Sequence, residues 1–341
     1  MRKLRILALM HRDLVPPLSV TGIDTTTADW KMEYDVTVTL QELGHEVRSL
    51  GLHAELGPLR EALDDFEPHI VFNLLEGFDD NPSLDQNVVS YLEMKRVPFT
   101  GCNSRGLVLG RDKTIGKKLL AYHRIAVPDF FLVSRGRRPK RPMRLGFPLI
   151  VKSADLDASI GISQASVVED DARLAERVRF MHERIGSDAL VESYIDGREL
   201  YVGILGNRRT QALPIWELDF SKMPEESRRI ATERLKWSIA YQKRHGIVTG
   251  AAGGLGPGLD QRIQRTCKRV YKILGLTGYA RIDLRLGAGD KVYVIEANPN
   301  PQLAYGEDFA ESADSAGIPY HNLLQRIVNL GLRWAHPGAP D

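Results

Sequence analysis

Cysteine is scarce in this chain of 341 residues, because only Cys102 and Cys267 are present. They lie far apart and neither belongs to a Cys-x-x-Cys pair, which disfavours a disulfide scaffold and thiol catalysis. Long apolar runs are also missing, since no stretch approaches the roughly 18 residues of a membrane span. The apolar run that follows the basic start stops at His11, so a first β-strand is favoured over a signal peptide. We therefore expect a soluble, cytoplasmic protein.

A charge excess of one sign is also lacking. The chain has 46 lysines and arginines against 44 aspartates and glutamates, so the composition does not indicate a nucleic-acid partner. The basic cluster from Arg135 to Arg144 is interrupted by glycine and proline and lacks interleaved aromatic residues, which is typical of a solvated loop. With 43% hydrophobic and 26% charged residues, the chain is expected to be globular, with two or three domains.

The order of the predicted elements indicates an α/β protein. Strand and helix patterns alternate through the first hundred residues, which predicts a small parallel sheet whose ligand-facing edge lies at the carboxyl ends of its strands. We expect three domains, comprising residues 1–105, 106–195 and 196–341. The charged segment 219–246 is either a mobile lid or a surface helix with ordinary charges.

An acidic motif follows a predicted strand near the end of the chain. Residues in the run Lys291–Ile295 alternate as in a strand, so Glu296 and Asn298 are expected to point to the same face. Asp283 is expected to reach them from a neighbouring strand. Two carboxylates and one amide oxygen suit Mg²⁺, and the lack of histidine and cysteine in this cluster disfavours zinc there. The alternative is an ordinary hairpin with acidic residues at its exposed end.

Two lysines and a loop of small residues favour phosphate binding. Lys152 ends a predicted buried strand, and small residues in the following loop, such as Ser159, allow backbone amides to approach a phosphate. Lys113 is the second candidate cation. Glu192 and Glu199 are candidate hydrogen-bond acceptors for an adenine amine and a ribose, or else exposed turn residues.

These motifs, taken in order, resemble the ATP-grasp fold and, within it, the D-alanine:D-alanine ligase group. The resemblance covers nearly the whole chain and rests on five motifs: Asp112-Lys113, Leu149–Lys152 with its small-residue loop, Leu190–Ile195 with Glu199, Arg281-Ile-Asp283, and Glu296-Ala-Asn298-Pro. It implies an N-terminal domain with a small parallel sheet, followed by central and C-terminal ATP-grasp subdomains that hold ATP between two antiparallel sheets.

The resemblance also implies a role for each matching residue. It assigns one or two Mg²⁺ ions to Asp283, Glu296 and Asn298, and the oxyanion of a tetrahedral intermediate to Arg281. The implied ATP-binding residues are Lys113, Lys152, Ser159, Glu192, Tyr194, Ile195, Glu199 and Lys236. The implied reaction joins a carboxylate to an amine through an acyl phosphate, and the family often forms homodimers.

The two substrate pockets depart from the family pattern. His11-Arg12-Asp13 replaces a glycine-rich segment that binds the first amine, and Gln302 replaces a glycine near the oxyanion hole. We therefore predict a ligase for amino acids or a small peptide. The alternatives are a D-alanine:D-alanine ligase proper, a phosphotransferase on the same fold and a non-catalytic nucleotide-binding protein. Candidate substrate contacts are Asp13, Glu76, Asn300 and Gln302.

Overall fold

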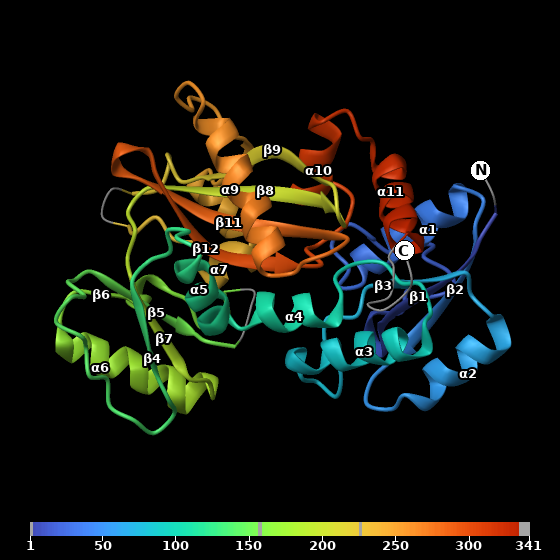
Figure 1. The fold of residues 1–341 in the computed structure, drawn as a ribbon, viewed down its shortest axis with the longest axis horizontal. Coiled ribbons are helices and arrows are strands. Elements are labelled where there is room, and N and C mark those ends of the chain that lie inside the picture. Colours follow the sequence, from blue (N-terminus) through green and yellow to red (C-terminus); the bar gives the residue numbers. More distant parts are fainter. Residues whose placement is uncertain (1–2, 156–158, 225–226, 334–341) are drawn as a thin grey trace.

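The computed structural model describes residues 3–155, 159–224 and 227–333. Its strands form three sheets, one parallel and two antiparallel, and Figure 1 shows the parallel sheet at one end of the molecule and the antiparallel pair at the other. This architecture confirms the predicted fold class. Within the described ranges, no helix combines the length and apolar character that a membrane crossing requires.

The N-terminal sheet is parallel and has the order β2-β1-β3. Its strands are β1 (Arg5–His11), β2 (Glu46–Leu52) and β3 (Ile70–Asn73). Central strand β1 has five consecutive fully buried residues, Ile6–Met10, because helices cover both faces of the sheet. These helices are α1 (Lys31–Glu42), α2 (Gly57–Phe66), α3 (Asp85–Lys95) and, from the far end of the chain, α11 (Tyr320–Leu332).

The second sheet is antiparallel, with the order β4-β7-β5-β6. It comprises β4 (Phe130–Val133), β5 (Leu149–Ser153), β6 (Val167–Val168) and β7 (Ala189–Ser193). Helix α6 (Asp171–Phe180), which continues as a π-helical turn through Ile185, packs Leu174 and Val178 against its core. Helices α4 (Ser104–Arg111) and α5 (Lys113–Tyr122) connect the N-terminal unit to this sheet.

The third sheet has five antiparallel strands in the order β10-β9-β8-β11-β12. Its strands are β8 (Arg198–Gly206), β9 (Thr210–Asp219), β10 (Val248–Ala251), β11 (Tyr279–Gly287) and β12 (Lys291–Pro299). Helix α9 (Leu259–Ile273) packs an apolar stripe against it, including the buried Ile263, Cys267 and Val270. The remaining helices are α7 (Glu233–Trp237), α8 (Ile239–His245) and α10 (Asp308–Ser315).

The sequence analysis did not identify two local features. Helices α4 and α5 are separated at Asp112, whose carboxylate caps α5 by accepting the backbone N–H groups of Thr114 at 3.0 Å and Ile115 at 2.8 Å. Helix α10, which the sequence analysis did not identify, carries several acidic and serine residues. The strands of each sheet fall within one predicted domain, while the domain boundaries themselves stay a prediction.

Docking of α11 on the N-terminal unit requires a glycine. A Cβ atom at Gly331 would lie 2.5 Å from the Phe99 carbonyl oxygen and 2.7 Å from Ile70 Cδ1. We predict that Gly331→Ala lowers the free energy of unfolding by about 1–3 kcal/mol, because this overlap outweighs the higher helix propensity of alanine. Urea unfolding would measure the change.

Gly57→Ala is the matched control, since a Cβ at this first residue of α2 meets nothing within 4 Å. It should leave stability unchanged or raise it by up to about 1 kcal/mol. Equal stability of the Gly331→Ala and wild-type proteins would contradict the proposed contact.

Candidate active site

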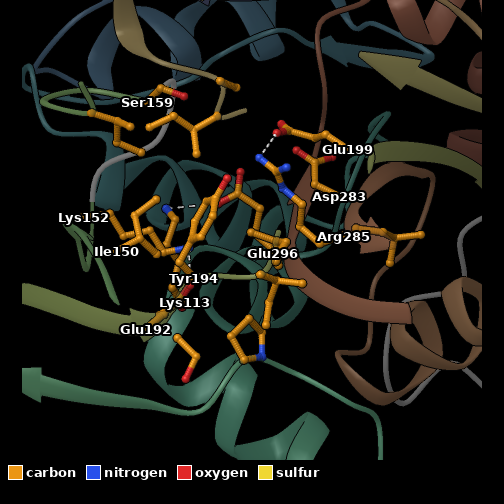
Figure 2. A pocket seen from close by; sticks show the side chains of 18 of the residues that line it. Lys113, Ile150, Lys152, Ser159, Glu192, Tyr194, Glu199, Asp283, Arg285 and Glu296 are labelled. Carbon is orange, nitrogen blue, oxygen red and sulfur yellow. Dashed lines mark hydrogen bonds and ion pairs between the residues drawn. The ribbon is translucent and has the colours of Figure 1, made fainter. Parts of the chain in front are cut away.

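A pocket lies between the two antiparallel sheets. Figure 2 shows charged side chains from both sheets converging on it, among them Lys152 and Glu192 from one sheet and Asp283 and Glu296 from the other. Nine residues predicted from the sequence line it: Lys113, Lys152, Ser159, Glu192, Tyr194, Ile195, Glu199, Asp283 and Glu296. Apolar side chains complete the lining, including Ile150, Leu284 and Ile295. The pocket therefore combines apolar surface with charged groups of both signs.

A buried carboxylate holds two lysines in one wall of the pocket. Glu192 Oε2 lies 2.8 Å from Lys152 Nζ, and its Oε1 lies 3.0 Å from Lys117 Nζ. Lys117 also donates a 2.6 Å hydrogen bond to the Ile295 carbonyl on β12. The sequence analysis missed Lys117, although it lies four residues after Lys113 and so on the same face of α5. An adenine amine would have to share the oxygens of Glu192 with these lysines.

The pKa values in this cluster follow from burial and charge together. Burial favours the neutral form of Lys117 and lowers its pKa to about 8, with Lys152 acting in the same direction and Glu192 opposing both. Burial alone would raise the pKa of Glu192, but the charges of Lys117 and Lys152 outweigh it and hold that pKa below its ordinary value. The cluster therefore carries a net positive charge at neutral pH.

The predicted metal ligands come together on β11 and β12. Asp283 lies directly opposite Glu296 in the strand register, and Arg281 lies opposite Asn298. The Asn298 side-chain amide donates a 3.0 Å hydrogen bond to Asp283 Oδ2. Lys113 Nζ lies 3.9 Å from Glu296 Oε2. Carboxylate and amide oxygens thus share one face of the hairpin, and Asp283 and Glu296 line the pocket.

Arg281 forms a bidentate ion pair with Asp283. Its Nε and Nη2 atoms donate to the two carboxylate oxygens at 2.7 and 2.9 Å, and its guanidinium lies over the Tyr201 ring, 4.6 Å from the centroid. Burial by itself would lower the pKa of Arg281, but the charge of Asp283 outweighs this and raises it above the ordinary value. The side chain is a fixed cation at the edge of the metal-ligand face.

Arg285 is a second cation that the sequence analysis missed. It follows Arg281 and Asp283 at the two-residue spacing of β11, and this alternation is the signal that identifies it. Its Nη2 lies 2.7 Å from Glu199 Oε2, and it lines the pocket. The other Glu199 oxygen accepts a 2.8 Å hydrogen bond from the Tyr201 hydroxyl. Glu199 is therefore held in place from two sides.

The loop after β5 contacts the charged segment 219–246. The Gly161 N–H donates to Glu233 Oε2 at 2.8 Å, and the Glu233 N–H donates to the Ile162 carbonyl at 3.0 Å. Ile230 and Ala231 from the same segment line the pocket. These contacts place the segment over the pocket beside Ser159, where a lid would lie. The side chain of Lys236, on α7, lies outside the described part of the structure.

An acidic residue in this loop is turned toward hydroxyl groups. This residue is Asp155. Its Oδ1 accepts hydrogen bonds from the Ser153 hydroxyl, at 3.1 Å, and from the Ser187 hydroxyl. Asp157 and Ala158 lie outside the described residues.

The four predicted substrate contacts do not line this pocket. Asp13 contacts His11 and Arg12 at the end of β1, while Glu76 and Gln302 are exposed. Asn300, with a φ of 52°, accepts the Cys102 N–H at 2.8 Å and packs so closely on Gly101 that a Cβ there would lie 2.5 Å from Asn300 Oδ1. Its oxygen therefore ties β12 to the loop before α4. Whether any of the four contacts a substrate stays a prediction.

Glu33, on the first turn of α1, is a buried carboxyl group that the sequence analysis missed. Its exposed fraction is 1%, and neither carboxylate oxygen has a partner from another described residue. Burial raises its pKa to about 7, and the charge of Glu76 acts in the same direction. Its position in an amphipathic helix, where an apolar residue is expected, is the signal in the sequence.

Comparisons with known proteins agree on the family. Residues 119–329, more than half of the chain, match the model of the D-ala D-ala ligase C-terminus. The uncharacterized protein y4sG of Sinorhizobium fredii is 31% identical over 306 residues, which cover 87% of this chain and 86% of that protein. The D-alanine–D-alanine ligase of Desulforudis audaxviator is 28% identical over 305 residues, covering 87% and 84% of the two chains.

The fold is likewise similar to solved structures of this group. The crystal structure of D-alanine–D-alanine ligase from Bacillus anthracis complexed with ATP superimposes with a TM-score of 0.72 and 24% identity, covering 97% of this chain and 98% of that one. This confirms the predicted arrangement of a parallel sheet followed by two antiparallel sheets. The chain belongs to the D-alanine–D-alanine ligase family of the ATP-grasp fold and is an ATP-dependent ligase that forms an amide bond.

Proposed function

We propose that this ligase binds Mg-ATP between its two antiparallel sheets and joins the carboxylate of an amino acid or small peptide to an amine. The observation that carries the proposal is the placement of Lys113 and Lys152 in the same pocket as Asp283 and Glu296. Cations suited to phosphates thus lie beside oxygen ligands suited to a divalent cation.

ATP suits a pocket that has both an apolar part and a charged part. Apolar side chains such as Ile150 and Leu284 suit the faces of an adenine ring, and the backbone of Tyr194 and Ile195, just after β7, offers polar groups to its edge. Lys113 and Lys152 suit the phosphates, and the contacts of Glu192 with Lys117 and Lys152 indicate that its main role is to hold these cations. We assign the ribose hydroxyls to Glu199.

The donor set fits one or two Mg²⁺ ions. Asp283, Glu296 and Asn298 supply hard oxygen atoms, which Mg²⁺ prefers, and they lie on one face of the β11–β12 hairpin. When bound, Mg²⁺ neutralises phosphate charge and orients the γ-phosphate for transfer.

The proposed reaction has two steps. A substrate carboxylate oxygen attacks the γ-phosphorus and releases ADP, which gives an acyl phosphate. The amine of the second substrate then attacks the carbonyl carbon, and phosphate and a proton leave as the amide bond forms. Arg281, fixed by Asp283 and Tyr201, provides a permanent positive charge for the oxyanion of the second step.

The residues expected near the substrates favour an amino acid or peptide substrate other than the D-alanine pair. His11, Arg12 and Asp13 stand where the family has a glycine-rich segment. Glu33 offers a buried carboxylate to a substrate amine, since neither of its oxygens has a partner from another described residue. The cytoplasmic location and the possible homodimer stay predictions.

The first test is product analysis with amino-acid panels. We predict that ADP and phosphate release from Mg-ATP requires a particular carboxylate and a particular amine, and that the product is lighter than their sum by one water. Turnover only with two D-alanines would instead support the alternative of a D-alanine:D-alanine ligase proper. Tight ATP binding without turnover on any pair would favour a binding protein, and a stable phosphorylated acceptor would favour a phosphotransferase.

A second test concerns Arg281. We predict that Arg281→Lys lowers kcat by about 100-fold to 1000-fold, because lysine keeps the charge but loses the two-bond geometry toward Asp283 and the oxyanion. ATP affinity, measured by calorimetry, should change less than about threefold if the residue acts on the intermediate. Arg326→Lys, an exposed change on α11, is the control. Loss of ATP binding with an unchanged kcat would contradict this role.

A third prediction concerns the pH dependence of stability. The pKa of Glu33 is about 7 in the folded state and 4.5 ordinarily. Its contribution to the free energy of unfolding is therefore fully present below pH 4.5 and is lost as pH rises through 7. Above pH 7 the buried charge costs about 3 kcal/mol. Glu33→Gln should therefore be more stable than wild type at pH 8 and should flatten the decline between pH 5 and 8.

Urea unfolding at pH 5 and pH 8 measures this difference. Glu42→Gln, an exposed change on the same helix, should follow the wild-type pH dependence. If the wild type and Glu33→Gln lose the same stability between pH 5 and 8, the carboxyl does not titrate as inferred.

A further inference from the structure

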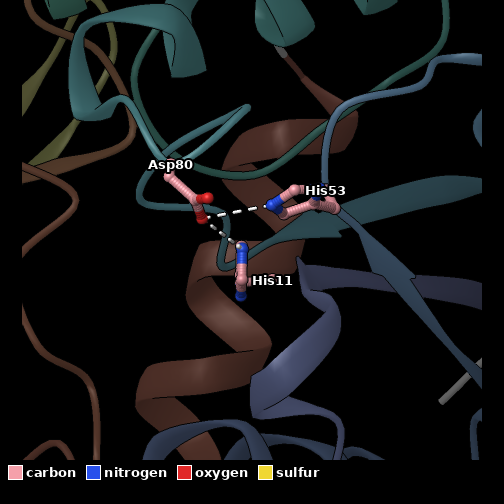
Figure 3. Close-up of side chains that lie close together, drawn as sticks. All are labelled: His11, His53 and Asp80. Atoms are coloured by element: carbon pink, nitrogen blue, oxygen red, sulfur yellow. Dashed lines mark ion pairs between the residues drawn. The ribbon is translucent and has the colours of Figure 1, made fainter.

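Three potential metal ligands meet at the carboxyl ends of the N-terminal strands. His11 is the last residue of β1, His53 directly follows β2, and Asp80 lies in the loop after β3. Figure 3 shows the three side chains pointing toward one another. None of them lines the pocket between the antiparallel sheets. The carboxyl ends of parallel strands are the usual place for a ligand in an α/β unit.

The distances suit a small ion. Asp80 Oδ1 lies 3.1 Å from His53 Nε2 and 3.7 Å from His11 Nε2, and one ligand atom from each residue lies within 4.8 Å of the others. In a tetrahedral zinc site with bonds of about 2.0–2.2 Å, ligand atoms lie about 3.3–3.6 Å apart. The contact at 3.7 Å is too long for a hydrogen bond. The Asp80 side chain is 76% exposed, so an ion can reach its carboxylate.

The backbone fixes the three residues relative to one another. His11 pairs with Leu52 in the parallel register, which places His53 beside the end of β1. Asp79 and Asp80 both have a φ of 54°, as in a type I′ turn, and Phe78 and Asn81 exchange two 3.1 Å backbone hydrogen bonds. The Asp79 N–H also donates to the His53 carbonyl at 2.8 Å. The turn that carries Asp80 is therefore tied to the strand end that carries His53.

A further carboxylate is placed to orient one imidazole. In the structure, His11 Nδ1 accepts a 3.3 Å hydrogen bond from the Asp13 N–H, and Asp13 Oδ2 lies 3.6 Å from the same nitrogen. Metal binding through Nε2 would move the imidazole proton to Nδ1, where the Asp13 carboxylate is the nearby acceptor that such a histidine commonly has. Arg12, the neighbouring base, contacts Asp13, with Nε 3.5 Å from Oδ1.

We propose that His11, His53 and Asp80 bind a zinc-class divalent ion, with Asp13 orienting His11. Two imidazoles and one carboxylate suit Zn²⁺ and related transition metals, whereas Mg²⁺ and Ca²⁺ prefer oxygen ligands only. Three protein ligands leave at least one coordination position open, as in sites that bind a water or a small ligand. The site is separate from the Mg²⁺ ligands and does not depend on the ligase proposal.

The test is a Zn²⁺ titration of the full chain without a polyhistidine tag, after treatment with a chelator. A chromophoric zinc chelator serves as competitor, and excess Mg²⁺ occupies the oxygen ligands of the nucleotide pocket. We expect one Zn²⁺ per chain, with affinity reduced at least ~100-fold in His53→Gln and in Asp80→Asn, and about 10-fold in Asp13→Asn. Visible absorption of bound Co²⁺ should be lost in the first two variants.

The control is His321→Gln. His321 Nε2 lies 2.9 Å from Glu42 Oε2, so this substitution removes an exposed histidine–carboxylate contact of the same kind elsewhere. The His321→Gln variant should bind Zn²⁺ like wild type. If His53→Gln fails to fold, Asp80→Asn carries the test, because asparagine readily adopts the positive φ of this turn. Absence of Zn²⁺ binding by the wild type, or equal affinity of wild type and Asp80→Asn, would overturn the proposal.

Discussion

The two antiparallel sheets are joined at the pocket by one buried ammonium group. Lys117, on α5, contacts Glu192 of the four-stranded sheet and the Ile295 carbonyl of the five-stranded sheet. Its charge is buried, and its interaction with Glu192 offsets the desolvation cost only while both partners stay in place. The contact therefore couples the relative position of the sheets to the position of Lys152, which shares the same carboxylate. In the proposed function, a nucleotide held between the sheets would depend on this geometry.

Alternation along β11 provides the second constraint. Arg281, Asp283 and Arg285 occupy every second position of a strand that is central in its sheet, so all three side chains project from the same face. Strand β12 places Asn298 opposite Arg281 and Glu296 opposite Asp283. The chemistry of this face thus follows from strand pairing alone, and a one-residue slip in register would send the whole set to the other face.

The parts of the site that sequence patterns predict are those set by local periodicity. Residues of one strand, such as Glu296 and Asn298, share a face because of the strand repeat, and the hairpin brings Asp283 to them. Lys117 was missed because three lysines lie between residues 113 and 118, and burial decides which of them matter. The three potential ligands His11, His53 and Asp80 lie far apart in sequence: the parallel register brings His11 and His53 together, and the turn at Asp79 and Asp80 is tied to His53 by a backbone hydrogen bond. A ligand set whose members are so far apart in sequence can be recognised only from the tertiary structure.

The acidic and basic side chains around the pocket are close to balanced in charge. Its acidic side chains, Glu192, Glu199, Asp283 and Glu296, each lie beside a basic one, with Lys113, Lys117, Lys152, Arg281 and Arg285 as partners. Five bases against four acids leave one excess positive charge. In the proposed function, Mg-ATP would bring both an anion and a cation, and each would find groups of opposite charge already in place. If Asp283 binds Mg²⁺ as proposed, part of its negative charge would be shared with the ion, which would leave Arg281 less neutralised at the point where we propose that the oxyanion forms.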